Sequence, residues 1–114
     1  MSNIPIALQL YTVRFELAER PKETIQAVAE IGYQGVEGGP PKGMSNQAYL
    51  ELLADNGLAL IADGTSPEEL ADDLDQVVER CAQLGIHTLM TGIGGTLRSK
   101  EGDWKTVVAE LGEA

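Results

Sequence analysis

The chain has 114 residues, of which 43% are hydrophobic and 23% are charged. This balance is typical of a soluble globular domain and excludes a wholly disordered chain. No apolar run is long enough to span a membrane, and residues 1–6 lack the features of a signal peptide, so we expect a cytoplasmic protein. The net charge of −10 disfavours nucleic-acid binding, because an acidic surface repels phosphate backbones.

The first predicted strand covers residues 6–11, where the side chains alternate in character. Its even-numbered positions are all aliphatic and would face a layer of helices. Gln9 and Tyr11 fall on the opposite face with a small alanine. That face suits the interior of a barrel or the side turned toward a ligand.

The rest of the chain alternates between helix-like and strand-like segments, separated by turns. Pro21 suits a first helical turn and Gly32 a helix end. Ser45 is a good N-cap, and the run from Ser66 to Glu69 has the pattern of a capping box. The predicted order is helix 21–31, strand 33–37, helix 46–56, strand 58–62, helix 67–84, strand 87–91 and helix 102–111.

Alternation of this kind predicts an α/β fold with a parallel sheet and helices packed on it. We count about four βα units in one continuous series over residues 1–114. A complete (β/α)8 barrel, or TIM barrel, needs eight such units and typically about 250 residues. Four strands alone would leave two open sheet edges, which proteins normally pair or cover.

The order of the motifs resembles that of the sugar phosphate isomerase/epimerase family, whose members are xylose isomerase-like TIM barrels. The segments at residues 7–14 (ALQLYTVR) and 30–37 (EIGYQGVE) resemble the first two strands of that family. Asp55-Asn-Gly-Leu58, Leu84-Gly85 and Trp104 also fit the family's order. The resemblance extends over nearly the whole chain and identifies residues 1–114 as the N-terminal half of such a barrel.

The resemblance implies metal-assisted proton transfer on a sugar or polyol, an activity of carbohydrate metabolism. Family members hold a divalent metal ion with carboxylates and a histidine from later strands. The chain ends before those strands, so we expect an incomplete barrel that is inactive alone and binds no metal or other cofactor by itself. The family's third strand often ends in a histidine, whereas this chain has Ile61-Ala-Asp-Gly64 there.

Four residues are candidates for substrate binding, while the catalytic residues stay unknown. Glu37 ends the second predicted strand, and barrel active sites lie at the carboxyl ends of strands. It could bind a sugar hydroxyl or serve as a solvated carboxylate at a loop start. Gln9 and Tyr11 could contact the same ligand or satisfy each other in the barrel core. Asp63 could join this site, although Asp-Gly is also an ordinary turn pair.

Three further features carry weaker expectations. His87, the only histidine, begins a strand and so lies at the wrong end for catalysis in this fold. Cys81, the only cysteine, cannot form an internal disulfide and suits a small buried position. Residues 92–96 form a glycine-rich loop that could cradle a phosphate, and Arg14 could contact a phosphate or make a surface ion pair.

Two alternatives remain open from the sequence. The chain could be a half-barrel whose copies pair through the open sheet edges into a homodimer, acting as a binding or scaffold protein. It could also resemble the endonuclease branch of the same barrel superfamily, which acts on damaged DNA. The net charge of −10 argues against the second alternative.

Overall fold

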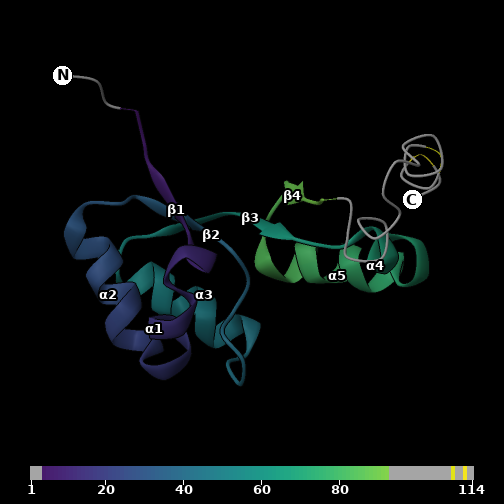
Figure 1. Cartoon of the computed structure of the whole chain (residues 1–114). Coiled ribbons are helices and arrows are strands. Elements are labelled where there is room, and N and C mark those ends of the chain that lie inside the picture. The colour runs from purple at the N-terminus through teal and green to yellow at the C-terminus, as the bar shows by residue number, and fades with distance from the viewer. Residues whose placement is uncertain (1–3, 93–108, 110–111, 113–114) are drawn as a thin grey trace.

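A computed structural model describes residues 4–92, 109 and 112 of the chain. The described strands and helices alternate along it (Figure 1). They are β1 (Ala7–Gln9), η1 (Leu10–Val13, a 3-10 helix), α1 (Arg14–Glu19), α2 (Pro21–Ile31), β2 (Gly35–Glu37), α3 (Asn46–Asp55), β3 (Ala59–Gly64), α4 (Pro67–Asp72), α5 (Leu74–Leu84) and β4 (Leu89–Met90).

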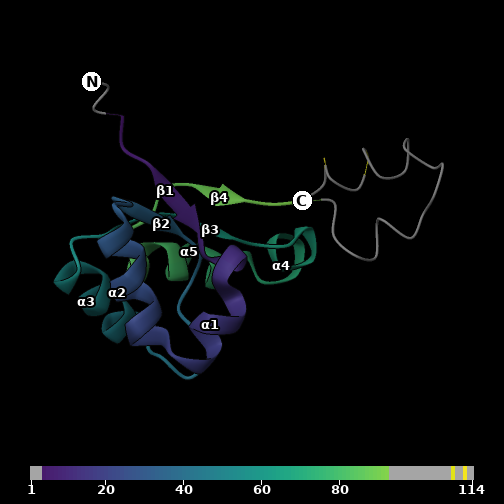
Figure 2. The ribbon, with the colours of Figure 1, turned by 60° about the vertical axis from the view of Figure 1, so that its left-hand side comes forward.

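The four strands form one parallel sheet in the order β1-β2-β3-β4. Parallel neighbours need a crossover between them, and here each crossover is helical. Figures 1 and 2 show the helices gathered on one side of the sheet. The predicted α/β fold with a parallel sheet of four strands and helices packed on it is therefore confirmed, while the helix predicted after the fourth strand lies outside the described residues.

The hydrophobic core lies between the sheet and this single layer of helices. Its most deeply buried side chains are Tyr49, Ile25, Leu53, Val36 and Val77. Fully burying an aliphatic side chain stabilises a fold by about 1.5–3 kcal/mol, so this layer supplies much of the stability. The opposite face of the sheet carries no helix among the described residues and exposes half of the Ile61 side chain.

Local signals in the sequence placed several helix ends correctly. The Ser45 hydroxyl accepts a hydrogen bond from the Ala48 amide at 3.1 Å, so it caps α3. Ser66 caps α4 in the same way through the Glu69 amide. Gly32 ends α2 with a φ of 117°, a conformation that side chains rarely adopt.

The first strand is shorter than predicted, and a helix follows it that the periodicity did not indicate. β1 stops at Gln9, because its neighbour β2 ends at Glu37, directly opposite. Beyond that point no ladder partner remains among the described strands, and the chain turns into η1 with Leu10 buried in the core. Tyr11 consequently leaves the sheet, and the prediction that it shares a strand face with Gln9 is wrong.

The long helix predicted over residues 67–84 is also wrong, because it is two helices. The break falls at Asp73, whose backbone leaves the helical region at φ −133° and ψ 41°. Aspartate is a poor helix former, and negative charge is unfavourable at the carboxyl end of a helix. Asp72 is the last residue of α4 and Asp73 its C-cap, so two carboxylates lie at that end.

The break also changes which side chains of the predicted apolar stripe are buried. Val77 and Leu84 lie in the core, whereas Leu74 and Val78 are more than half exposed. The predicted helix over residues 102–111 and nearly all of the glycine-rich loop at 92–96 lie outside the described residues. Among the helices that are described, none has the length and apolar character needed to cross a bilayer.

Candidate functional site

Three of the four predicted site residues lie at the carboxyl edge of the sheet. Gln9 and Glu37 are the last residues of β1 and β2 and stand opposite each other in the parallel register. Asp63 lies near the end of β3, one position beyond Ala62, the residue that opposes Glu37 across a bulge. The structure therefore places Gln9, Glu37 and Asp63 at the same end of the sheet, the end where barrel active sites lie.

Asp63 is a strand residue and not the turn residue that the Asp-Gly pair favoured. It pairs with Leu89 of β4, and its Oδ1 accepts a hydrogen bond from the Gly64 amide at 2.7 Å. Its carboxylate packs against the loop after β2, since a Cβ added at Gly39 would lie 3.1 Å from Oδ2. A residue larger than glycine at position 39 would displace this carboxylate.

Arg80 of α5 holds the carboxyl end of β3 in place. Its Nε lies 3.6 Å from Asp63 Oδ2, and its Nη1 lies 3.2 Å from Glu69 Oε2. Its Nη2 donates to the Gly64 carbonyl at 3.4 Å. The Nε atom is buried and has no hydrogen-bond acceptor within the described part of the chain. One guanidinium thus joins β3, α4 and α5 beside the candidate site, a contact that the sequence analysis missed.

Tyr49 supports the site from within the core. Its hydroxyl donates to the Gly38 carbonyl at 2.6 Å and so fixes the loop that follows Glu37. Burial raises the pKa of the Tyr49 phenol well above its ordinary value of 10.0, and the charges of Asp63 and Glu37 raise it further. The phenol therefore stays protonated as a hydrogen-bond donor near neutral pH.

Tyr11 lies apart from the sheet face, in an exposed group with Arg14 and Phe15. The Arg14 guanidinium carbon is 4.1 Å from the centroid of the Tyr11 ring and 4.5 Å from that of Phe15. Arg14 Nη1 also donates to the Tyr11 carbonyl at 2.9 Å. The surface ion pair weighed for Arg14 is not found among the described residues, and two cation–π contacts take its place.

His87 lies away from the carboxyl edge, as the sequence indicated, whereas Cys81 is less buried than expected. His87 is exposed and precedes β4, away from the carboxyl edge. Cys81 is partly buried against the core.

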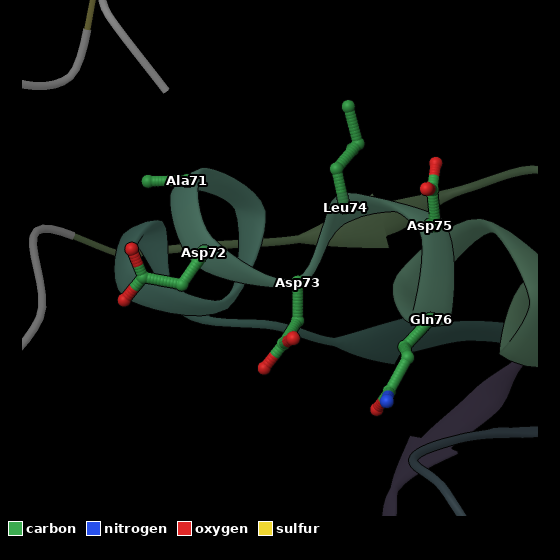
Figure 3. Close-up of a pocket in the computed structure, with 6 residues that line it drawn as sticks. All are labelled: Ala71, Asp72, Asp73, Leu74, Asp75 and Gln76. Carbon is green, nitrogen blue, oxygen red and sulfur yellow. The ribbon is translucent and has the colours of Figure 1, made fainter.

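Two surface hollows lie elsewhere. One follows the break between α4 and α5 (Figure 3), and the other lies between α3 and α5. Neither is lined by Gln9, Tyr11, Glu37 or Asp63.

The described residues do not fit a resident metal ion. Within the part of the chain that the structure describes, no group of three or more metal-ligating side chains is found. Glu37 and Asp63 are two carboxylates, and Asp63 is paired with Arg80. In the hollow of Figure 3, the carboxylates of Asp72, Asp73 and Asp75 point in different directions and do not converge on one position.

The comparisons with known proteins bear on the fold. No protein-family model matches the chain, and no curated protein does. A sugar phosphate isomerase/epimerase from Parabacteroides distasonis is a similar solved structure, with a TM-score of 0.67 and 19% identity. The match covers 97% of this chain and 46% of that one.

A second similar structure is a family 2 AP endonuclease from Brucella melitensis. The TM-score is 0.62 at 18% identity, and the match covers 95% of this chain and 47% of the endonuclease. The chain thus spans about half the length of both structures. At these identities the likeness establishes the fold alone: part of a TIM barrel, of which the structure describes four parallel strands and the helices between them.

Proposed function

We propose that this chain supplies part of the substrate site of a sugar phosphate isomerase/epimerase-like barrel. The observation that carries the proposal is the common position of Gln9, Glu37 and Asp63 at the carboxyl edge of the sheet. A carboxylate accepts hydrogen bonds from sugar hydroxyls, and an amide both donates and accepts. The similarity to a sugar phosphate isomerase/epimerase structure supports this substrate class.

The reaction proposed for the complete barrel is metal-assisted proton transfer on a sugar or polyol, a step of carbohydrate metabolism. The described residues lack the ligands for the metal, so the chain's proposed part is to bind and orient the substrate. Glu37 would hold a hydroxyl, and Gln9 would hold a neighbouring oxygen. We propose that the chain alone is inactive and that it acts in the cytoplasm.

Ligand-observed NMR on the full chain tests this proposal. We would titrate a panel of pentoses, hexoses, their phosphates and polyols, with and without Mg²⁺ or Mn²⁺. We expect weak binding of at least one member, and Glu37→Gln should weaken it at least about fivefold, since it removes a charged acceptor. Glu51→Gln, an exposed carboxylate change on α3, is the matched control and should leave binding unchanged.

Absence of binding across the whole panel would contradict the proposed role. Metal-dependent isomerase turnover by the chain alone would overturn its proposed inactivity. Action on DNA is not proposed, because the net charge of −10 opposes contact with phosphate backbones and no described feature favours it.

A further inference from the structure

The exposed apolar side chains are unevenly distributed over the four βα units. Among the described residues, the exposed large hydrophobics belong to the first unit or to the third and fourth, and residues 32–60 contribute none. They are Ile4, Ile6, Tyr11, Phe15, Ile31, Ile61, Leu74, Val78 and Met90. Exposure is thus concentrated on the flanks of the half-barrel and on the uncovered face of the sheet.

The uncovered face is part of this exposed surface. Gly35 belongs to that face, because a Cβ added there would meet Ile61 Cγ2 at 3.2 Å and Ala7 Cβ at 3.5 Å. Ile61 is 51% exposed and Met90 50%. In a closed barrel this face is the packed interior. An aliphatic interior surface in contact with water favours association with a partner of matching shape.

The two edge strands also have compatible directions. Within the described residues, β1 pairs only with β2, and β4 pairs only with β3. All four strands are parallel, so β4 of one copy could pair side by side with β1 of a second copy and keep the same strand direction. A two-fold axis that coincides with the axis of the new barrel would keep the strand direction, make both seams identical and close the ring.

Charge favours this arrangement over the alternative dimer, in which the third and fourth units of one copy would contact the same units of the other. Residues 59–114 carry eleven acidic side chains and four basic ones, a net −7, whereas residues 1–31 carry four acidic and three basic, a net −1. Pairing the third and fourth units of two copies would place −7 against −7. Pairing them with the first unit of the partner places −7 against −1, which costs much less repulsion.

We propose that two copies of this chain close into an eight-stranded barrel, with β4 of each copy beside β1 of the other. In this arrangement Gln9, Glu37 and Asp63 of both copies would lie at the same end of one barrel, so the second copy would contribute residues to the candidate site. The dimer itself does not depend on the proposed function. The sharing of a substrate site does rest on it, and the mass and linking experiments below separate the two.

The first experiment is the solution mass of the full chain by size-exclusion chromatography with light scattering at several concentrations. One copy has a mass of 12.2 kDa, so we expect about twice that value. Ile61→Lys and Met90→Lys place charge on the inner face and should give the monomer. Ala54→Lys, on the exposed side of α3, is the matched control and should stay dimeric. Circular dichroism would verify that each variant is folded.

The second experiment tests how the copies are arranged. In a Cys81→Ala background, one preparation carries Gln9→Cys and another carries Thr91→Cys, and the two are mixed before a short bifunctional thiol reagent is added. Since neighbouring strands lie about 4.8 Å apart, the ring predicts links that join one preparation to the other and few links within either preparation. The two variants differ in mass, so mass spectrometry assigns each linked product to its pair of copies.

A mass of 12.2 kDa at all concentrations would overturn the proposal, as would a polydisperse aggregate. A discrete dimer that links only like copies would overturn the ring arrangement. If the dimer and its links are found but no sugar binds, the barrel stands and the proposed function fails. If sugar binds to a monomer, the proposed function stands and the shared site fails.

Discussion

The second βα unit of this half-barrel, formed by β2 and α3 and called here the middle unit, is covered more completely than the units on either side of it, the flanks. Three of the five most deeply buried side chains, Val36, Tyr49 and Leu53, belong to β2 and α3, where no large hydrophobic is exposed. On the flanks, Phe15 is 70% exposed and Val78 is 59% exposed. In the helix layer α3 contacts both α2 and α5, and β2 is paired with β1 and β3, whereas β1 and β4 each have one partner strand among the described residues. How completely a βα unit is covered therefore depends on its neighbours in the sheet and in the helix layer.

The largest difference between the two regions should appear on truncating one leucine in each. Leu53→Ala removes a side chain that is 1% exposed and should lower the free energy of unfolding by about 2–5 kcal/mol. Leu74→Ala, at 53% exposure, should change it by less than about 0.5 kcal/mol in the isolated copy. Urea denaturation at low protein concentration measures both. Equal losses of unfolding free energy in the two variants would contradict the difference in coverage between the middle unit and the flanks.

Tyr49→Phe sharpens the account of the middle unit. The Gly38 carbonyl would lose its 2.6 Å hydrogen bond, at a cost of about 1–3 kcal/mol. The folded chain has the higher Tyr49 pKa, so the unfolded chain releases this proton first. The stability that the protonated Tyr49 phenol contributes is present below pH 10 and is lost as the pH rises above 10.

Denaturation profiles from pH 7 to 11 would separate the two effects of Tyr49→Phe. The variant should start less stable and then lose less stability than the parent above pH 10. Parallel profiles for the two proteins would show that this phenol is not shielded in the folded state.

Ser45→Ala should cost about 1 kcal/mol, because it removes the acceptor for the Ala48 amide at the start of α3. Ser45→Gly is the useful comparison, since glycine is tolerated at an N-cap and should cost only a few tenths, roughly 0.3 kcal/mol. Thermal unfolding of both variants checks this order. An alanine variant as stable as the parent would mean that the cap contributes nothing.

The smallest effect is expected on the flank, at Arg80. Its side chain is about a third exposed, so solvent weakens its ion pairs and Arg80→Gln should cost only about 0.5–1 kcal/mol. Glu69→Gln should cost still less, because that carboxylate is 46% exposed. Raising the salt concentration should shrink both differences. A loss above about 3 kcal/mol would mean that Arg80 carries more of the flank than its contacts indicate.

The sequence predicted those features that short-range chemistry decides. Proline at position 21, serine at 45 and glycine at 32 determine helix ends by local hydrogen bonds and backbone freedom, and α2 spans the predicted residues 21–31. The end of β1 depends on where β2 ends, which is a property of the register between segments distant in the chain. Periodicity within residues 6–11 could not reveal it.

The candidate site was predictable to the same extent. The position of Glu37 and Asp63 at the carboxyl edge followed from the ends of the predicted strands, and Gln9 was singled out by the face of the first strand on which it lies. Arg80 was missed, because its contact with Asp63 requires the relative placement of α5 and β3, which no local pattern encodes. Tyr11 was placed wrongly because β1 ends at Gln9, where its partner strand β2 also ends.

Hydrogen exchange at low and high protein concentration tests the central contrast most directly. In the isolated copy, amides of β2 and α3 should exchange slowly, and those of β1 and β4 should exchange much faster, since edge strands open more readily. At high concentration the account predicts that β1 and β4 become protected while β2 and α3 stay unchanged. Equal protection of all four strands at every concentration would contradict it.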